Sequence, residues 1–287
     1  QPIYLAGHSR PVRKVAYNYD GDLLFTCSDD QTICMYRTYD CARIGVFHVK
    51  EACKSFDLTK DTQFIITSTP NHGVQIFNVK DGSLLAQMPL PGSQAKQVKN
   101  TSFSLGEKLY LVVYEWDKVS YINVYDFKKT IETKDCDKAL VKQIILPKEH
   151  VVNQASWGPL NKTIYAATAS GKMIMFDVES QKEVVARDIH QKEIFSFEVS
   201  YDHTMLVTCS KDGTAKLLHP RTFEPVRVFN FIKPCRSACI SPLFDSEHSQ
   251  KFHVLLAGGQ DAQEVTTTAA QEGGFAMRLM SIIYGEQ

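Results

Sequence analysis

Two segments that lie far apart in the sequence share one pattern. Residues 19–32 read YDGDLLFTCSDDQT, and residues 201–214 read YDHTMLVTCSKDGT. Eight of the fourteen aligned positions are identical, without a gap, at a constant offset of 182 residues. Four units of about 45 residues would give this offset, and that is the length of one blade in a WD-type β-propeller. The repeat therefore predicts a chain built from blade-like units.

Short strand-like runs recur along the whole chain. They are rich in β-branched and aromatic residues and bounded by Gly, Asp, Asn or Pro, which is typical of buried strands; they read LLFTCS, FIITST, LYLVVY, TIYAATAS, MLVTCS and HVLLAGG. Each unit also ends a strand in a hydrophobic pair, namely Met35 with Tyr36, Ile76 with Phe77, Val124 with Tyr125, Met175 with Phe176, Leu217 with Leu218 and, more loosely, Arg278 with Leu279. No segment has a sustained 3.6-residue apolar period, so we predict an all-β chain.

The pairs are unevenly spaced, which requires insertions in the loops of some units. One is the charged stretch of residues 128–142, KKTIETKDCDKALVK, which we expect to be a mobile exposed loop. Another is the polar stretch of residues 258–279 in the last unit, which contains Thr266, Thr267 and Thr268. A propeller does not need this second loop to close. The three threonines are therefore candidates for partner contact, and a variable surface loop is the alternative.

A histidine and an aspartate recur at one spacing. His8 precedes Asp30 by 22 residues, and His190 precedes Asp212 by the same number. In the WD pattern this His hydrogen-bonds the Asp in a turn, a Ser two residues before the Asp joins, and an aromatic residue six positions after it completes the set. We predict two structural networks, His8, Ser28, Asp30 and Tyr36 in the first unit, and His190, Ser210 and Asp212 in the fifth, where Leu218 replaces the aromatic residue.

The same residue types also occur in the Ser-His-Asp triad of hydrolases. A structural role is the better interpretation, because the set recurs at one spacing and an active site is normally unique. The sequence contains no G-x-S-x-G elbow and no Gly-rich phosphate loop. We therefore predict no enzymatic activity, no catalytic residue and no cofactor.

Composition excludes several other classes of protein. The chain has 287 residues with 32 basic and 32 acidic side chains, and this zero net charge argues against direct DNA binding. No run of about 18 apolar residues is present, so we expect no membrane contact. The eight cysteines form no CxxC pair, which argues against a metal site. Scattered thiols suggest a reducing compartment, either the cytosol or the nucleus, and of these we expect a cytoplasmic protein.

Four stretches of the chain resemble one family. Residues 7–26, 156–164, 210–217 and above all the GGQDAQEVTTT and EGGFAMRL segments of residues 258–279 are similar to the i subunits of eukaryotic translation initiation factor 3. The resemblance implies a seven-bladed, non-enzymatic propeller that acts as a scaffold and binds the b and g subunits of that factor. It implies that the protein reaches the small ribosomal subunit mainly through them.

The resemblance also carries expectations about single residues and about the number of blades. A helix of the b subunit would lie against the fifth and sixth blades, where Asp202 takes an acidic position of the family and His219 departs from one. The family continues past Gln287, so residues 1–287 would be a single propeller domain with about six of seven blades. Residues 3–5 would then be a strand of the last, missing blade. The alternative function is a WD-repeat adaptor that recognises substrates for a ubiquitin ligase or acts in signalling.

Overall fold

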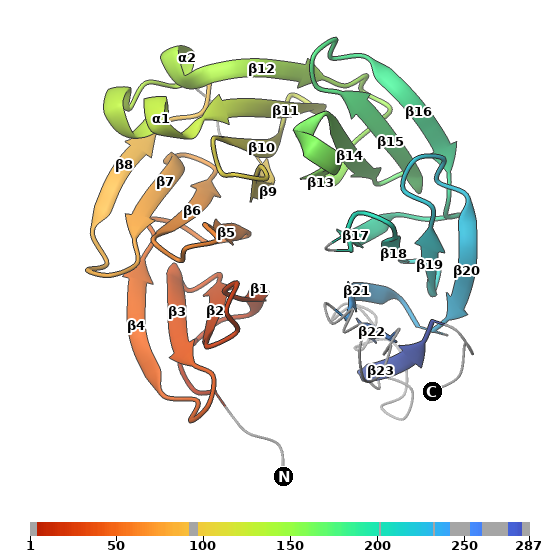
Figure 1. The fold of residues 1–287 in the computed structure, drawn as a ribbon, viewed down its shortest axis with the longest axis horizontal. Helices are drawn as coiled ribbons and strands as arrows, with labels where there is room; N and C mark the ends of the chain where they lie inside the picture. The colour runs from red at the N-terminus through yellow and green to blue at the C-terminus, as the bar shows by residue number, and fades with distance from the viewer. Residues whose placement is uncertain are drawn as a thin grey trace. The chain divides into compact units, whose positions relative to one another are not determined.

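The computed structural model describes residues 5–91, 97–200, 202–231, 233–241, 253–259 and 275–282. These residues form six antiparallel sheets and three short helical segments (Figure 1). Their contacts divide the chain into two compact units. Unit 1 comprises Gln1–Glu149 and Ala155–Trp157, and unit 2 comprises His150–Gln154 and Gly158–Gln287.

Unit 1 contains the first three sheets, and in each of them the strands follow one another in sequence order. The first sheet has β1 (Val12–Tyr17), β2 (Leu23–Ser28), β3 (Thr32–Arg37) and β4 (Arg43–His48). The second has β5 (Phe56–Leu58), β6 (Phe64–Thr69), β7 (Gly73–Asn78) and β8 (Leu84–Met88). The third has β9 (Gln97–Phe103), β10 (Leu109–Trp116), β11 (Val119–Asp126) and β12 (Leu140–Ile145).

Unit 2 contains the other three sheets, with the last three residues of β13 assigned to unit 1. The fourth sheet has β13 (Val152–Trp157), β14 (Thr163–Thr168), β15 (Lys172–Asp177) and β16 (Glu183–Asp188), with a short turn of 3-10 helix, η1 (Pro159–Asn161). The fifth has β17 (Ile194–Val199), β18 (Leu206–Ser210), β19 (Thr214–Leu218) and β20 (Pro225–Asn230). The sixth shows three strands within the described residues, β21 (Cys235–Ile240), β22 (His253–Gly258) and β23 (Ala276–Ser281).

The strand-like runs seen in the sequence fall in the second strand of each sheet, and each hydrophobic pair falls in the third strand. The pairs also mark an irregularity that the sequence did not predict. In the first five sheets the register between the third and fourth strands shifts at the pair, as between Met35 and Tyr36 or between Leu217 and Leu218. Such a bulge bends the outer strand and increases its local twist.

Residues 127–139 form two short helices, α1 (Phe127–Thr133) and α2 (Cys136–Ala139), so the expectation of a mobile loop there was wrong. Each helix begins at an aspartate whose side chain accepts a backbone hydrogen bond, from the Lys129 amide to Asp126 and from the Asp137 amide to Asp135. These caps satisfy amides that would otherwise lack a partner. Helices of seven and four residues are too short to show a 3.6-residue period in the sequence.

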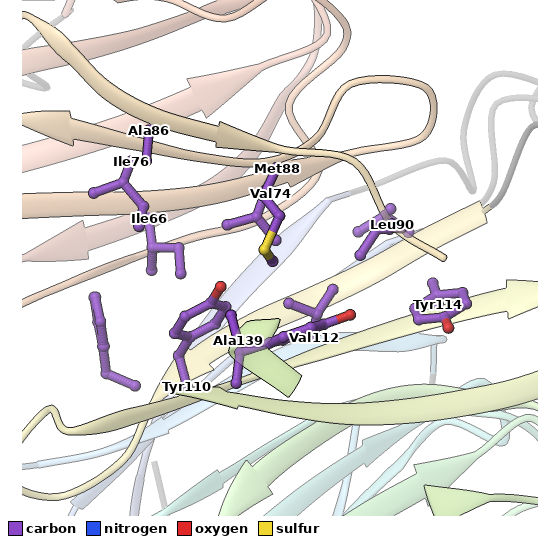
Figure 2. Close-up of a cluster of buried hydrophobic side chains, with 13 residues drawn as sticks. Ile66, Val74, Ile76, Ala86, Met88, Leu90, Tyr110, Val112, Tyr114 and Ala139 are labelled. Atoms are coloured by element: carbon purple, nitrogen blue, oxygen red, sulfur yellow. The ribbon is translucent and has the colours of Figure 1, made fainter. Parts of the chain in front are cut away.

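Buried side chains hold neighbouring sheets of unit 1 together. Figure 2 shows one such cluster, in which apolar side chains of β6, β7 and β8 face aromatic and aliphatic side chains of β10. Ala139 of α2 belongs to the same cluster, and Phe127 of α1 packs edge-on against Phe103, with ring centroids 5.2 Å apart. The buried Thr130 hydroxyl lies 2.8 Å from the Tyr110 hydroxyl. The charged insertion is therefore anchored in the core by its few apolar and small residues.

The first and second sheets pack through a second cluster, which contains Cys27, Cys53, Phe25 and Phe56. In unit 2 the fourth and fifth sheets share a cluster around Tyr165 and Phe223, and the fifth and sixth share one that includes Cys209 and Cys235. Each pair of successive sheets within a unit thus buries a common apolar layer.

The described chain is all-β apart from its short helices, as predicted. The expectation of a strand at residues 3–5 falls mostly outside the described residues, and Leu5 is not part of a strand. The single domain over residues 1–287 and the seventh blade stay predictions. Among the described helices, none has the length and apolar character needed to cross a lipid bilayer.

Candidate functional site

His190 lies in the connection between β16 and β17 and is held by two side chains of the fifth sheet. Its Nδ1 is 3.0 Å from Oδ2 of Asp212, and its Nε2 is 2.8 Å from Oγ1 of Thr208. The side chain of His190 is fully buried. Burial lowers the pKa of His190, although the neighbouring Asp212 opposes this shift. We therefore assign a neutral imidazole that donates from Nδ1 to Asp212 and accepts from the Thr208 hydroxyl.

Asp212 organises the turn between β18 and β19. Its Oδ1 accepts hydrogen bonds from the amide and hydroxyl of Thr214, at 2.9 and 2.6 Å, and its Oδ2 accepts one from the Gln191 amide at 3.2 Å. Burial raises the pKa of Asp212, but these hydrogen bonds and His190 outweigh burial and lower it overall. The carboxylate therefore ties the connection before β17 to the turn after β18.

The first sheet repeats this network in unit 1. His8 Nδ1 lies 2.9 Å from Asp30 Oδ2, and His8 Nε2 lies 2.7 Å from Thr26 Oγ1. Asp30 accepts from the amide and hydroxyl of Thr32, at 3.0 and 2.6 Å, and from the Ser9 amide at 2.9 Å. Despite the opposing effect of burial, these donors and His8 lower the pKa of Asp30 to about 2.

The two predicted serines serve the turn rather than the histidine. Ser28 accepts a hydrogen bond from the Asp30 amide and donates one to the Arg10 carbonyl. Ser210 does the same with the Asp212 amide and the Lys192 carbonyl. Because each serine hydroxyl is engaged with backbone and each histidine with a threonine, the residues are not arranged as a Ser-His-Asp triad.

Tyr36 contacts the segment of chain that leads to His8. Its hydroxyl donates to the Ala6 carbonyl at 3.4 Å, and the ring is almost completely buried. A Cβ added at Gly7 would stand 2.1 Å from this hydroxyl, so the chain entering the first sheet passes directly against Tyr36. Leu218, at the equivalent position of the fifth sheet, is fully buried in an apolar cluster instead.

Sequence reasoning missed the two threonines of each network, Thr26 and Thr32 in the first sheet and Thr208 and Thr214 in the fifth. A signal for them was present. All four belong to the eight identical positions of the two repeated segments. They take the second nitrogen of the histidine and the second oxygen of the aspartate, so the complete network is His, Asp, Ser and two Thr.

The candidate partner-binding residues Asp202 and His219 lie at one end of the fifth sheet. Asp202 is in the turn between β17 and β18, and His219 begins the turn between β19 and β20. The strand ends beside these turns are paired, Val199 with Leu206 and Leu206 with Leu218, so the two turns lie at the same end of the sheet. Both residues are exposed. Thr266, Thr267 and Thr268 lie outside the described residues.

Asp202 also has a local role. Its carboxylate accepts hydrogen bonds from the hydroxyl of Ser200 at 2.6 Å and from the amide and hydroxyl of Thr204 at 3.1 and 2.7 Å. These bonds lower the pKa of Asp202 against the opposing effect of its partial burial. The side chain is therefore negative at neutral pH and fixed in its turn.

One group of possible metal ligands occurs among the described residues, formed by Asp135, Cys136 and Asp137. Asp135 caps α2 and forms an ion pair with Lys138, with 3.3 Å between the charged atoms. The capping of a short exposed helix accounts for this group without a metal.

Comparisons with known proteins bear on the fold class and the family of the chain. A family model for the WD domain, G-beta repeat matches residues 2–37 and 182–218, and these two ranges include every residue of both histidine–aspartate networks. Together with the repeated sheets, these matches confirm the predicted fold class, a WD40-type β-propeller.

The chain is similar over its whole length to curated proteins that share one name, "Eukaryotic translation initiation factor 3 subunit I". It is 34% identical over 292 residues to the protein of Dictyostelium discoideum, covering 100% of this chain and 83% of the relative. It is 32% identical over 293 residues to the proteins of Drosophila pseudoobscura pseudoobscura and Drosophila melanogaster, covering 100% of this chain and 85% of each relative. The chain therefore belongs to the family of eukaryotic translation initiation factor 3 subunit I.

Proposed function

We propose that this protein is a non-enzymatic scaffold subunit of the translation initiation factor 3 complex. The observation that carries this proposal is the similarity over the whole chain to subunit I proteins of Dictyostelium and Drosophila. The chemistry of the described sites agrees with it, because the histidines, aspartates and serines of both networks are engaged in holding turns. Such a protein acts through its surface.

The proposed partners are the b and g subunits, and the proposed contact for a helix of the b subunit is one end of the fifth sheet. Asp202 contributes a fixed negative charge there. Val226, close to the turn that His219 begins, is 66% exposed. An exposed aliphatic side chain beside a charged turn suits a helix that docks by an apolar face with charged residues at its rim.

His219 stands at the second position of this surface where the resemblance implies an acidic residue, and a histidine has no carboxylate to supply there. Its Nδ1 accepts hydrogen bonds from the amide of Arg221 and the hydroxyl of Thr222, at 3.3 and 3.4 Å, which holds the ring over its own turn. Glu224 ends the same turn and pairs with Arg187 at 3.6 Å. We propose that Asp202, rather than His219, supplies the acidic contact of this surface.

We further propose that the protein is cytoplasmic and reaches the small ribosomal subunit mainly through the b and g subunits. Equal numbers of acidic and basic side chains favour indirect contact, because phosphate binding requires a local excess of Lys and Arg.

A direct binding experiment tests the proposal. The purified chain is titrated by calorimetry with the C-terminal region of the b subunit and, separately, with the N-terminal region of the g subunit. We expect saturable binding of each region and a ternary complex when both are present. A b-subunit region of the same composition in scrambled order is the control. Absence of binding by both native regions to the folded chain would contradict the proposal.

A further inference from the structure

The sequence repeat also relates two pairs of cysteines. Cys27 and Cys209 are among the eight identical positions of the repeated segments, at the offset of 182 residues. Cys53 and Cys235, which lie outside those segments, are related by the same offset. Each pair therefore has an equivalent place in its unit. The first cysteine is in the second strand of a sheet, and the second lies at or just before the first strand of the next sheet.

In unit 2 the two sulfur atoms of the pair are in direct contact. Sγ of Cys209 in β18 lies 2.8 Å from Sγ of Cys235, the first residue of β21. Both side chains are fully buried. A disulfide requires about 2.05 Å between the sulfurs, so the pair needs a movement of less than about 1 Å to form that bond.

Among the described residues, few polar groups lie near the pair, and Ser196 forms a hydrogen bond with Cys209. Both sulfurs belong to an apolar cluster that includes Ala215, Phe231 and Ala238. The remaining sulfur contacts of Cys235 are to the carbonyls of Ser237 and Ala257, each at 3.9 Å. Within the described residues, the group with metal-ligating geometry lies elsewhere, around Cys136. Two thiols without further ligands can join each other but do not complete a zinc site.

The two thiols of the equivalent pair in unit 1 are also hydrogen-bonded to each other, but Cys53 has further polar partners. Cys27 Sγ donates to the Cys53 carbonyl at 3.5 Å, and Cys53 Sγ lies 3.2 Å from the Thr67 hydroxyl and 3.6 Å from the Ser55 carbonyl. The thiol of Cys53 thus has polar partners that a disulfide would remove. The unit 1 pair has the same place in its unit but competing polar partners, so it serves as a comparison for the unit 2 pair.

We propose that Cys209 and Cys235 are an oxidisable dithiol, and that a peroxide converts them into a disulfide that joins the fifth sheet to the sixth. One thiol, as thiolate, attacks an oxygen of hydrogen peroxide. The O–O bond breaks, and a sulfenic acid and one water form. The second thiol then attacks the sulfenic sulfur, the S–S bond forms and a second water leaves. The two cysteines lose two electrons and two protons, and one peroxide is reduced to two waters.

Burial makes this reaction slow. Burial and the hydrogen bond to Cys235 both raise the pKa of the Cys209 thiol, so the reactive thiolate is scarce. Cys239 is exposed, and an external oxidant reaches it first. Oxidation of the buried pair is therefore slow compared with Cys239, and the disulfide that results is shielded from reducing agents.

Peptide mapping of the full chain tests the proposal. The folded protein is treated with hydrogen peroxide, its remaining thiols are alkylated after unfolding, and it is digested with trypsin without reduction. Cleavage after Lys192, Lys211, Arg227 and Arg236 places Cys209 in peptide 193–211, Cys235 in peptide 228–236, and Cys239 in another peptide. We expect peptides 193–211 and 228–236 to appear linked, lighter by two hydrogen atoms than their sum, and to separate after dithiothreitol.

Variants and unfolding temperature provide the controls. Cys235→Ala removes the linked peptides, and Cys27→Ala leaves them. The oxidised wild-type protein unfolds at a higher temperature than the reduced protein, because the disulfide restricts the unfolded chain, and the shift is absent from Cys235→Ala. Recovery of Cys209 and Cys235 as alkylated thiols from peroxide-treated protein in which Cys239 is oxidised would overturn the proposal. Linkage of Cys235 to Cys239 in place of Cys209 would also overturn it.

Discussion

His190 and Asp212 form a partly buried hydrogen bond across 22 residues of chain, with 3.0 Å between Nδ1 and Oδ2. His8 and Asp30 form the same bond, at 2.9 Å, in the first sheet. In both cases the aspartate also accepts from the backbone amide that follows the histidine and from a threonine two residues on. One side chain thereby fixes both the entry to a sheet and the turn between its second and third strands.

Asp212→Ala tests the contribution of this bond to stability. The change leaves the Thr214 and Gln191 amides without their acceptor, and His190 Nδ1 keeps only the Thr214 hydroxyl, at 3.1 Å. We expect the free energy of unfolding in urea to fall by about 1–3 kcal/mol, the usual cost of unsatisfied buried polar groups. Asp188→Ala, at an exposed aspartate two residues before His190, is the control and should change it by less than about 0.5 kcal/mol. Equal effects of the two variants would contradict a structural role for Asp212.

Stability should fall with acidification in two ranges of pH. Because the pKa of His190 is lowered by burial, the unfolded chain takes up this proton first, and stability declines as pH falls below about 6.5. Because the pKa of Asp30 is lowered to about 2, its contribution is complete above about pH 4 and is lost as pH falls toward 2. For Asp30 the loss is at most about 2.5 kcal/mol.

Urea unfolding of the wild type and of His190→Gln between pH 8 and pH 3 checks the upper range. The difference in stability between the two proteins should shrink as pH falls below about 6.5, since the variant has no buried imidazole to keep neutral. A difference that stays constant over that range would show that His190 does not titrate with unfolding.

Gly171→Ala tests how closely the turn at Gly171 approaches the backbone around His190. Gly171 has a φ of +86°, and a Cβ there would stand 2.2 Å from the His190 carbonyl oxygen and 2.8 Å from that of Lys192. Gly106 has a φ of +78° but open space around the same position, so Gly106→Ala is a matched control for the backbone conformation alone. We expect Gly106→Ala to cost about 1 kcal/mol of stability and Gly171→Ala clearly more, measured by thermal unfolding. Similar costs would argue against steric contact at Gly171.

Asp202→Asn tests the proposed acidic contact of the fifth sheet. An Asp202→Lys change would also remove the three hydrogen bonds that hold the turn, so it cannot separate binding from local structure. The Asn side chain removes the charge and keeps an oxygen that can accept from the Thr204 amide. We expect about two- to fivefold weaker binding of the b-subunit region, because an exposed charge at a rim contributes about 0.5–1 kcal/mol.

Two controls accompany this variant. Asp20→Asn changes the aspartate at the equivalent position of the first sheet, and Thr204→Val loosens the Asp202 turn without changing its charge. Both should bind like the wild type. If Thr204→Val weakens binding as much as Asp202→Asn, the turn geometry and not the charge is responsible.

The repeat made most of the fold predictable. A strand that is buried on both faces appears in the sequence as a short β-rich run between turn residues. These runs are the second strands of the sheets, such as β2 and β18. Most residues of the outer strands β4 and β20 are exposed, and their register with the third strand shifts after Leu217 and Met35. No local sequence signal specifies this shift, so the bulges were not predicted.

The insertion after β11 shows a second limit. Its charged side chains suggested a loop, yet the structure depends on a few residues among them, the caps Asp126 and Asp135 and the buried Thr130. The bond from Thr130 to Tyr110 joins residues 20 positions apart and cannot be inferred from spacing. In the networks, by contrast, identity at equivalent positions already marked Thr26 and Thr208.

Affinity purification of the tagged full chain from cell lysate, followed by mass spectrometry, tests the central claim most directly. We predict that the b and g subunits of translation initiation factor 3 are recovered with it in stoichiometric amounts, together with further subunits of that complex. Recovery of ubiquitin-ligase or signalling proteins without any initiation factor would contradict the account and favour a substrate-recognition adaptor.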